Sequence, residues 1–473
     1  MPLKKSFNIL SDDSWLSLAK VEIFKDKILR QFPDVELNLI FDKKNGTSDF
    51  FISDSIVADN YFPVVLERGL LNDVVIFNPI VLDKINNGKN IIIGSAIPGQ
   101  TLMAIRFLEQ ALPNLSQKEI DFDFQLIDGN ILEKLNQLNA GKYDAIILSA
   151  ADLNLLLAFE LSKHIIQQLL SNKKIMVLPL FECTPKPNQA AIIIRTSINN
   201  KSAIEILNKI GNENLFIALQ KEIAFANMQA ENNAMAFGAF RLELTKTAFN
   251  YASGINKKGV EFAGWGYKMD LNLVNNKIFS SAKYMKDFFT YKYFNEIQLT
   301  QNCEAVFIAS HKAVHLSGIK KTIEGKRVWA AGTKSWFQLA KQGIWVDGCS
   351  DGLGLEWLQP IFESKLVNLP KEKITIITNK ASAEEWKSEG CNAVASYELI
   401  PQFSQEIADE VASAEILFWT SFQQYEIYKK HCKPNAQHAC PAGKTADLLM
   451  REGLSPVIFP TIKAFSDWRH NSR

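Results

Sequence analysis

The chain has 473 residues, 47% of them hydrophobic and 22% charged, which is the ordinary range for a globular protein. This length is too great for one hydrophobic core and suggests about three domains. The 52 lysines and arginines nearly balance the 51 aspartates and glutamates, so the formal net charge of +1 argues against a broad electrostatic attraction to nucleic acid or to a membrane surface.

The sequence predicts neither a secretory signal nor a membrane span. The N-terminal residues lack the sustained apolar core of a secretory signal. The most apolar window, residues 143–161, carries Asp144, Asp152, Asn154 and Glu160, which makes it a poor membrane span. Six cysteines without close pairing fit a reducing compartment. We therefore expect a cytoplasmic protein.

Residues 7–40 predict a strand, a helix and a strand. Ser11 and Ser14 are candidates for the helix cap, and an apolar helix face begins at Trp15. A polar loop at residues 43–47 precedes a stretch predicted as a second helix that ends near Gly69. Residues 73–77 form a short apolar run that predicts a buried strand.

The segment at residues 121–157 gives the clearest fold signal. An alternating strand pattern ends at Asp128-Gly129, Ile131, Leu135 and Leu138 then recur at helical spacing, and residues 144–148 form a short apolar run. Strand, helix and strand in this order predict a βαβ unit with parallel strands. We expect two α/β lobes over residues 1–203, the second at about 89–172, with a ligand cleft at the strand ends.

The pattern changes after this region. Two helical stretches reach about Met228, and three strand-like runs between residues 236 and 265 predict a small antiparallel meander. We assign residues 204–270 to a small α+β domain. Repeated βα units follow in residues 277–473, with apolar runs at 304–308, 327–331, 374–377 and 415–419, each followed by small or hydroxyl-bearing residues.

The N-terminal region resembles hydroxymethylbilane synthase (porphobilinogen deaminase) over residues 6–268. Three segments and the meander carry the resemblance: Asp128-Gly-Asn-Ile-Leu-Glu-Lys-Leu135, Lys142-Tyr-Asp-Ala-Ile-Ile-Leu-Ser-Ala-Ala151, Thr184-Pro-Lys-Pro-Asn-Gln-Ala-Ala191 and Phe237-Gly-Ala-Phe240. It implies a two-lobed fold like that of periplasmic binding proteins, followed by a small third domain.

The residues that carry the family's chemistry are replaced. The cysteine that holds its dipyrromethane cofactor falls at about Asn233, and the chain has no cysteine between Cys183 and Cys303. Family arginines fall on Asp12 and Asp128, which would repel a polycarboxylate. The catalytic aspartate is expected near residues 77–81, where this chain has Phe-Asn-Pro-Ile-Val. We expect a deaminase scaffold without deaminase activity and without a cofactor.

Residues 277–468 resemble uroporphyrinogen-III synthase. The matching segments, in order, are Ala305-Val-Phe-Ile-Ala-Ser-His-Lys-Ala-Val314, Val328-Trp-Ala-Ala-Gly-Thr-Lys-Ser335, Gly390-Cys-Asn-Ala-Val-Ala-Ser-Tyr397, Ile416-Leu-Phe-Trp-Thr-Ser421 and Ala439-Cys-Pro-Ala-Gly-Lys-Thr-Ala446. The resemblance implies a second two-lobed α/β part that closes linear hydroxymethylbilane with loss of water.

That resemblance also implies the site. Tyr397 matches the family's tyrosine, placed to help the hydroxyl leave. Hydroxyl side chains at strand-to-helix turns are expected to bind the substrate, together with backbone N–H groups. These residues are Ser310, Ser335, Thr420, Ser421 and Thr445. Each of them could instead be a helix cap without a ligand.

Other motifs favour structural roles. His431, Cys432, His438 and Cys440 lack the usual spacing of zinc ligands, so we expect no metal. Cys183 is expected to be a buried thiol.

Three functions stay open at this stage. The first is a cyclase of tetrapyrrole (heme) biosynthesis supplied by a separate deaminase. The second is a bifunctional deaminase and cyclase, which would need an unrecognised attachment residue for the cofactor. The third is a non-catalytic scaffold that binds the linear tetrapyrrole or a true deaminase.

Overall fold

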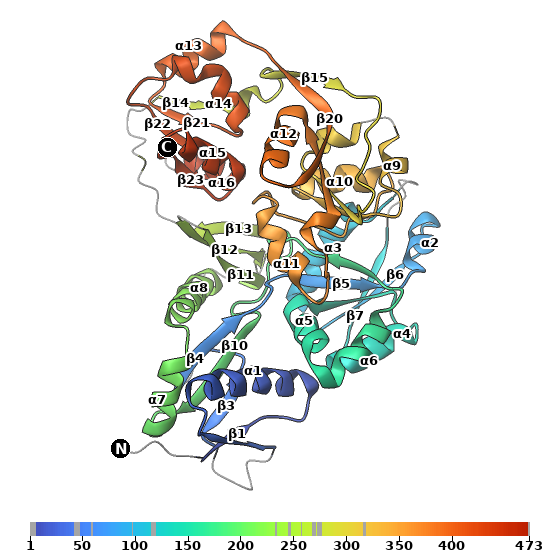
Figure 1. Cartoon of the computed structure of the whole chain (residues 1–473), viewed down its shortest axis with the longest axis vertical. Helices are drawn as coiled ribbons and strands as arrows, with labels where there is room; N and C mark the ends of the chain where they lie inside the picture. The colour runs from blue at the N-terminus through green and yellow to red at the C-terminus, as the bar shows by residue number, and fades with distance from the viewer. Residues whose placement is uncertain are drawn as a thin grey trace.

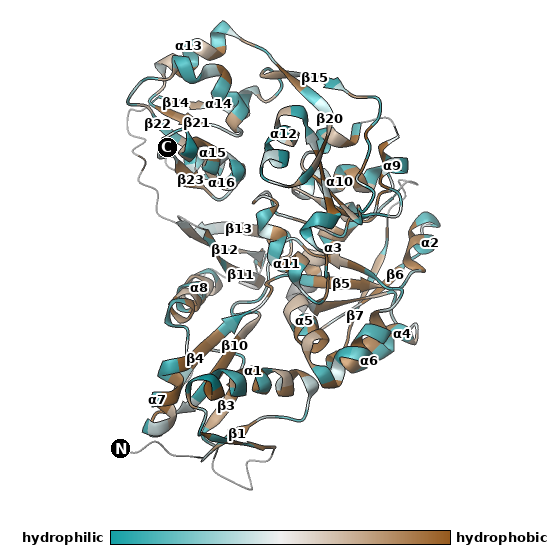
Figure 2. Cartoon of the chain, viewed as in Figure 1, coloured by the Kyte–Doolittle hydropathy of each residue, from teal (hydrophilic) through white to brown (hydrophobic). Residues whose placement is uncertain are grey.

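The computed structural model describes residues 6–41, 48–57, 60–96, 98–114, 120–231, 234–244, 247–256, 258–266, 271, 277–315 and 318–471. Figure 1 shows an elongated molecule in which four α/β lobes and a small sheet follow one another. We name the lobes 1 to 4 by their sheets. Figure 2 shows hydrophobic residues concentrated along the strands and hydrophilic ones on the outer helices, so each lobe has a mixed α/β core.

Lobe 1 is a five-stranded sheet in the order β2-β1-β3-β10-β4. Its elements are β1 (Ser6–Leu10), α1 (Trp15–Gln31), β2 (Glu36–Ile40), β3 (Phe50–Ser53), β4 (Tyr61–Arg68), β10 (Ala191–Ser197) and α7 (Lys201–Ile210). The predicted strand, helix and strand at residues 7–40 are confirmed. The helix expected to end near Gly69 is wrong, because β3 and β4 occupy that stretch. Pro63 is tolerated there because β4 is an edge strand.

Lobe 2 is a five-stranded sheet in the order β7-β6-β8-β5-β9. Its elements are β5 (Asp73–Phe77), α2 (Val81–Asn86), β6 (Ile91–Ser95), α3 (Pro98–Ala111), β7 (Phe122–Leu126), α4 (Ile131–Asn139), β8 (Ala145–Ser149), α5 (Ala150–Ala158), α6 (Glu160–Leu170) and β9 (Lys174–Val177). The predicted βαβ unit is confirmed: β7 and β8 both run parallel to β6 between them. The sheet also takes β5 and β9, which lie outside residues 89–172.

A small antiparallel sheet follows, as the meander predicted. It consists of β11 (Ala234–Leu244), β12 (Thr247–Asn256) and β13 (Glu261–Gly266), with α8 (Glu213–Glu231) packed against it. In Figure 1 this sheet lies between the N-terminal lobes and the C-terminal lobes. Phe240 and Phe249 are fully buried under it.

Lobe 3 has a six-stranded sheet in the order β15-β20-β19-β16-β17-β18, in which only the pairing of β15 with β20 is antiparallel. Its elements are β15 (Phe289–Tyr293), β16 (Ala305–Ile308), the 3-10 turn η3 (His311–His315), α9 (Ile319–Thr322), β17 (Arg327–Ala330), α10 (Thr333–Lys341), β18 (Gly348–Cys349), α11 (Gln359–Glu363), β19 (Ile374–Asn379), α12 (Lys380–Ser388) and β20 (Asn392–Pro401).

Lobe 4 has a parallel sheet in the order β14-β21-β22-β23. Its elements are β14 (Ile278–Ser280), α13 (Gln405–Ser413), β21 (Ile416–Phe418), α14 (Phe422–Tyr428), β22 (Gln437–Pro441), α15 (Lys444–Arg451), β23 (Val457–Phe459) and α16 (Ile462–Asn471). The chain forms β14 of lobe 4 first, then all of lobe 3, and then the rest of lobe 4. The two C-terminal lobes are therefore joined by two crossings.

Lobes 2 and 3 share one hydrophobic interior. The backbone N–H of Val177 at the edge of lobe 2 donates to the carbonyl of Asp347 beside β18 at 2.7 Å. The indole N–H of Trp336 donates to the carbonyl of Ala111 at 3.0 Å, and its ring meets Phe107 edge-on at 4.9 Å. The N-terminal and C-terminal halves are consequently packed as closely as parts of one domain.

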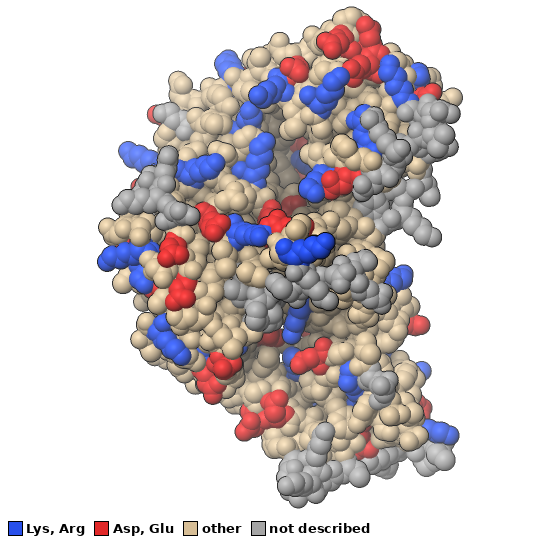
Figure 3. Space-filling view, turned by 180° about the vertical axis from the view of Figure 1, so that it is seen from behind, with Lys and Arg blue, Asp and Glu red and all other residues tan. Residues whose placement is uncertain are grey.

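Among the described residues, no helix combines the length and the apolar character that crossing a membrane requires. Figure 3 shows lysines and arginines interspersed with aspartates and glutamates over the face that it draws, as the small net charge suggests.

Candidate functional site

A cleft of about 310 Å³ lies between lobes 1 and 2. Its charged lining comes from α1, from the loop after β3, from β4 and β5, from α4 and α5, and from the segment before β10. These residues are Lys20, Asp54, Glu67, Asp73, Lys134, Asp152 and Lys186. Carboxylates outnumber cations, which is the opposite of what a polycarboxylate ligand requires.

Asp73 is the most buried of these carboxylates, with 5% of its surface exposed. The side-chain amide of Gln189 donates to its Oδ1 at 2.9 Å. Burial raises the pKa of Asp73 to about 7, and the nearby charge of Asp152 adds to the effect. Burial also raises the pKa of Asp152. Two carboxyl groups that disfavour each other's ionisation therefore share this cleft.

The family's functional positions lie elsewhere or serve local structure. Residues 77–81 do not line the cleft: Phe77 and Val81 are fully buried in lobe 2, and the Asn78 amide donates to the carbonyls of Leu138 and Tyr143. No aspartate stands at these positions, so the sequence reading that the catalytic aspartate is replaced stays a prediction. Asp12 supports the start of α1 by accepting from the N–H of Ser14, which is the N-cap residue, and from the Ser17 hydroxyl. Burial opposes its ionisation, but these hydrogen bonds outweigh it and lower the pKa of Asp12. The position of the missing cysteine, Asn233, lies outside the described residues.

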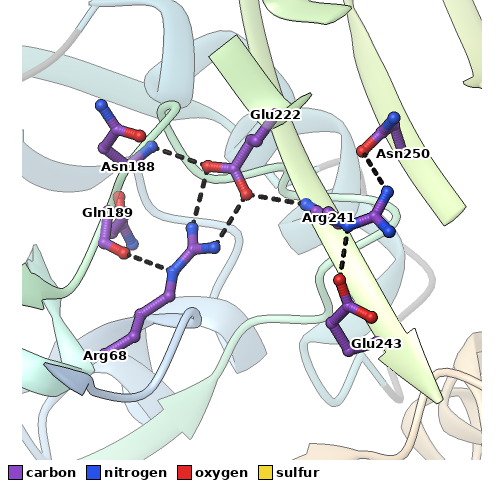
Figure 4. A network of polar contacts seen from close by, with 7 residues as sticks. All are labelled: Arg68, Asn188, Gln189, Glu222, Arg241, Glu243 and Asn250. Atoms are coloured by element: carbon purple, nitrogen blue, oxygen red, sulfur yellow. Dashed lines mark hydrogen bonds and ion pairs between the residues drawn. The ribbon is translucent and has the colours of Figure 1, made fainter. Parts of the chain in front are cut away.

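A buried ion pair joins lobe 1, and the segment that precedes β10, to α8 and the small sheet (Figure 4). Arg68 at the end of β4 makes two hydrogen bonds to the Glu222 carboxylate of α8, at 2.8 and 2.9 Å. Glu222 also accepts the backbone N–H groups of Asn188 and Arg241, at 2.7 and 2.8 Å. Because Glu222 is fully buried, its charge depends on these four donors.

The second candidate site lies at the carboxyl ends of the strands of lobe 3. Tyr397 of β20 is 4% exposed, and the side chains of Ser310 and Asn379 lie near enough to its hydroxyl to oppose part of the effect of burial on its pKa. The sheet order β20-β19-β16 explains this meeting, because Asn379 ends β19 and Ser310 follows β16. Burial raises the pKa of Tyr397, so the phenol stays protonated at neutral pH. The structure thus brings together two residues that the sequence proposed for the site.

Two further tyrosines face this cluster. The rings of Tyr291 and Tyr293 from β15 each lie 6.1 Å from the ring of Tyr397. The ammonium of Lys312 lies 4.2 Å above the Tyr291 ring, and the His315 ring lies 5.9 Å from that of Tyr293. The sequence analysis did not predict a role for either tyrosine, although β15 alternates aromatic and polar residues.

Cations also gather here. Burial lowers the pKa of His311 to about 4, and Lys334, Lys312 and His315 contribute by their positive charges. Burial likewise lowers the pKa of Lys312, with contributions from Lys334 and Lys286. Within the described ranges, no carboxylate lies within ion-pair distance of Lys286, Lys312 or Lys334. A group of cations without counter-ions is a suitable place for an anionic ligand.

The other four residues predicted to bind substrate lie at or just before the first turns of helices. Ser421 caps α14 in a capping box with Gln424, and the Thr420 hydroxyl donates to the Gln424 side chain at 2.7 Å. Ser335 is buried in the first turn of α10, with 6% exposed. Thr445 lies half-buried in the first turn of α15. A binding role for these four residues stays a prediction.

Lobes 3 and 4 touch through α12. The Gln423 amide donates to the Ser382 hydroxyl at 3.3 Å, and Lys444 pairs with Glu385 at 2.9 Å. Lys444 also lies 4.1 Å from the centre of the Trp386 ring. These contacts hold the strand ends of the two lobes near each other.

Histidine and cysteine side chains serve packing in this region. His438 accepts the Trp419 indole N–H at 3.1 Å, and Cys440 is fully buried. The described residues contain no group of three or more histidines, cysteines or carboxylates that could hold a metal ion. Cys183 is a buried thiol, as expected, and burial raises its pKa well above the ordinary value.

Comparison with known proteins finds sequence similarity in the N-terminal part. The family model "Porphobilinogen deaminase, dipyromethane cofactor binding domain" matches residues 58–205. The chain is 23% identical over 264 residues to the porphobilinogen deaminase of Buchnera aphidicola subsp. Acyrthosiphon pisum (strain Tuc7), a match that covers 50% of this chain and 79% of that protein. With the porphobilinogen deaminase of Fusobacterium nucleatum subsp. nucleatum, identity is 25% over 252 residues, covering 48% and 80%.

Solved structures give weaker likenesses. The uroporphyrinogen-III synthetase of Helicobacter pylori 26695 aligns with a TM-score of 0.25 and 15% identity, covering 39% of this chain and 91% of that one. A probable amino-acid ABC transporter extracellular-binding protein of Bacillus subtilis aligns with a TM-score of 0.28 and 11% identity, covering 43% and 91%. Residues 58–205 thus match a porphobilinogen deaminase domain, the N-terminal half of the chain is similar in sequence to porphobilinogen deaminases, and a second two-lobed α/β part is joined to it.

Proposed function

We propose that the chain is a uroporphyrinogen-III synthase-type cyclase of tetrapyrrole biosynthesis, which closes linear hydroxymethylbilane with loss of water. The observation that carries the proposal is the Tyr397 cluster. A buried phenol with Ser310 and Asn379 at the strand ends lies beside the rings of Tyr291 and Tyr293 and beside cations that lack counter-ions.

Each part of this cluster matches a need of the reaction. The terminal hydroxyl must leave as water, and a protonated phenol can donate a hydrogen bond to that oxygen as the C–O bond breaks. The electron pair of the adjacent pyrrole nitrogen replaces the lost bond. For the type III isomer, the substituted α-carbon of the last pyrrole attacks the resulting methylene carbon, and its bond to the preceding methylene then breaks. The unsubstituted α-carbon takes that freed methylene, which inverts the last ring, and releases a proton. The raised pKa of Tyr397 suits a donor and disfavours a base.

The positive charges of the lysines complement the negative charges of the substrate. A linear tetrapyrrole of this pathway carries several carboxylates, and Lys312 and Lys334 lie where they can bind them beside the tyrosine rings. The N-terminal cleft is a poor place for the same ligand, because its carboxylates outnumber its lysines. We therefore assign the cyclising step to the C-terminal half and no deamination to the N-terminal half.

This assignment implies a partner. Without the cofactor cysteine, the chain depends on a separate deaminase for hydroxymethylbilane. The test is an assay in which porphobilinogen, an independent deaminase and this protein are combined and the uroporphyrin isomers are separated. A shift from the type I to the type III isomer supports the cyclase.

A further inference from the structure

A cavity of about 860 Å³ lies where the two halves meet, and we call it the junction cavity. Its volume falls in the range of about 300–1,000 Å³ that small-molecule sites occupy. The small sheet and α3 line it from the N-terminal half, and α10 of lobe 3 lines it from the C-terminal half. A ligand in this cavity would therefore touch both halves of the chain.

Contacts near the boundary hold these walls in place. The Tyr251 hydroxyl of the small sheet donates to the carbonyl of Phe181 at 3.2 Å. The indole N–H of Trp336 in α10 donates to the carbonyl of Ala111, the last residue of α3, at 3.0 Å. These bonds form within the chain itself, so the walls of the cavity need no ligand to bring them together.

The lining carries an excess of negative charge. Both of its cations are already paired, Arg106 with Glu261 and Lys463 with Asp467. Three other carboxylates of the lining have no cation within ion-pair distance among the described residues: Glu109, Glu182 and Asp351. The charge of the cavity therefore favours a cationic ligand and disfavours an anionic one.

Glu182 is the carboxylate that we expect to meet such a ligand. Although it is exposed where it lines the cavity, the surrounding protein removes part of its hydration and raises the pKa of its carboxyl. The Thr333 side chain lies near enough to oppose part of this rise. Burial raises the pKa of Asp351 to about 7, and the charge of Glu182 adds to the effect. A cation beside Glu182 would relieve this repulsion.

Aromatic rings line the same cavity from both halves. The centre of the Trp265 ring lies 4.5 Å from that of Tyr251 in the small sheet. Phe337 of α10 follows Thr333 by four residues, so the two share a face of that helix, and both line the cavity. Trp265 and Phe337 are half-buried, which leaves part of their surface open. Aromatic faces attract ammonium groups, so the rings and the carboxylates independently favour the same kind of ligand.

We propose that the junction cavity binds a small organic cation, a primary ammonium group on an apolar body, with Glu182 as its acceptor and counter-ion. The ammonium lies between Glu182 and the Phe337 ring, and the apolar body packs against Trp265. The inference does not depend on the proposed cyclase, because Tyr397 lies outside this lining. It gives the N-terminal half a role in ligand binding that needs no deaminase chemistry.

Two probes of nearly the same size test the role of charge on the full chain. Phenethylammonium carries the positive charge, and 2-phenylethanol has a neutral hydroxyl in its place. Ligand-observed NMR titrations at about pH 8, where the amine is still protonated, should show at least about fivefold tighter binding of the ammonium. The difference should shrink as salt is added.

Two variants test the carboxylate and the ring separately. Glu182→Gln keeps the size of the side chain and removes its charge, so it should abolish the preference for the ammonium. Phe337→Leu keeps an apolar side chain and removes the aromatic face. It should weaken binding of the ammonium by about threefold and that of the alcohol by less.

A third variant is the matched control. Glu363 of α11 is also exposed, accepts from the Gln359 side chain at 2.7 Å, and lies outside the cavity. Glu363→Gln should therefore keep the full preference for the ammonium. If Glu182→Gln fails to fold, the comparison of Phe337→Leu with this control still decides the result.

Equal affinity for the two probes, no binding of either, or a full preference that survives Glu182→Gln or Phe337→Leu would overturn the proposal. The isomer assay gives an independent result. Type III product without a preference for the ammonium leaves the cyclase standing and removes the junction site. A preference for the ammonium without type III product does the reverse.

Discussion

Asp351 of lobe 3 accepts the backbone N–H of Leu180, which directly follows lobe 2, at 3.0 Å. A few residues away, Val177 at the edge of β9 donates to the carbonyl of Asp347 beside β18. One backbone hydrogen bond and one bond to a side-chain carboxylate thus join the edges of two sheets that belong to different halves. Lobes 2 and 3 form a common body, with lobe 1 and lobe 4 attached at its two ends, as Figure 1 shows.

Tyr397→Phe should slow cyclisation at least about tenfold, because the phenol would no longer donate to the departing hydroxyl. The rate is measured with hydroxymethylbilane generated in situ. Tyr428→Phe is the matched control: that buried hydroxyl accepts the backbone N–H of Ser404 at 2.9 Å in lobe 4. The control should lose stability and keep its rate. An unchanged rate in Tyr397→Phe would remove the tyrosine from the mechanism.

Lys312→Met and Lys334→Met should each raise KM by roughly tenfold with little change in kcat, since a charge-assisted hydrogen bond contributes about 1.5–3 kcal/mol to binding. The effect should shrink as salt is added. Lys320→Met, at an exposed position of α9, serves as the control. A fall in kcat with constant KM would mean that the lysines act on the transition state instead of holding carboxylates.

The intact mass of the purified protein should equal the mass of its sequence, because no cysteine between Cys183 and Cys303 can carry a dipyrromethane. Incubation with porphobilinogen should leave that mass unchanged and release no ammonia. A stable adduct of two pyrrole units would favour the bifunctional alternative, and peptide mapping would then identify the attachment residue.

The pKa of Asp73 gives a prediction for the stability of the fold. Folding raises the pKa of its carboxyl from the ordinary 3.8 to about 7. Between these two pH values the folded chain therefore binds more protons than the unfolded chain. The free energy of unfolding therefore falls as the pH rises from about 4 to 7. Asp73→Asn should be more stable than the parent at about pH 8 and equal to it at about pH 4.

Urea unfolding at the two pH values measures this difference. Asp26→Asn, at an exposed position of α1, should leave the stability unchanged at both. If Asp73→Asn were less stable than the parent at the higher pH, the carboxylate would be a net stabilising partner in the cleft.

Glu222→Gln should destabilise the protein by about 3–5 kcal/mol, because it leaves the Arg68 guanidinium buried without its counter-ion. Glu243→Gln changes a carboxylate whose side chain is 58% exposed and should cost at most about 1 kcal/mol. The two variants are compared by urea unfolding. Equal effects would mean that the buried network contributes no more than an ordinary surface pair.

Local patterns predicted much of the fold. Residues 121–149 contain strand alternation, helical spacing and a short apolar run, and β7, α4 and β8 occupy those places. The same reasoning failed before Gly69. The short β3 carries little periodicity, and β4 has a bulge opposite Ile192 and Ile193, which disturbs the alternation that marks a strand.

Sheet membership was harder to predict than secondary structure. Residues 73–77 were predicted as a strand, but nothing local assigns β5 to lobe 2, because its partners β8 and β9 follow about 70 to 100 residues later. The site shows the same limit. Resemblance to a family indicated Ser310 and Tyr397, whereas the raised pKa values of Asp73 and Asp351 arise from burial, which only the packed structure creates.

The most direct test of the proposed cyclase is the isomer assay with purified protein, porphobilinogen and an independent deaminase. After oxidation, the type I and type III uroporphyrins are separated and their ratio is compared with that of the deaminase alone. We predict a predominance of type III that Tyr397→Phe reduces. Type I alone, as in spontaneous ring closure, would contradict the cyclase and leave a binding scaffold as the function of both halves.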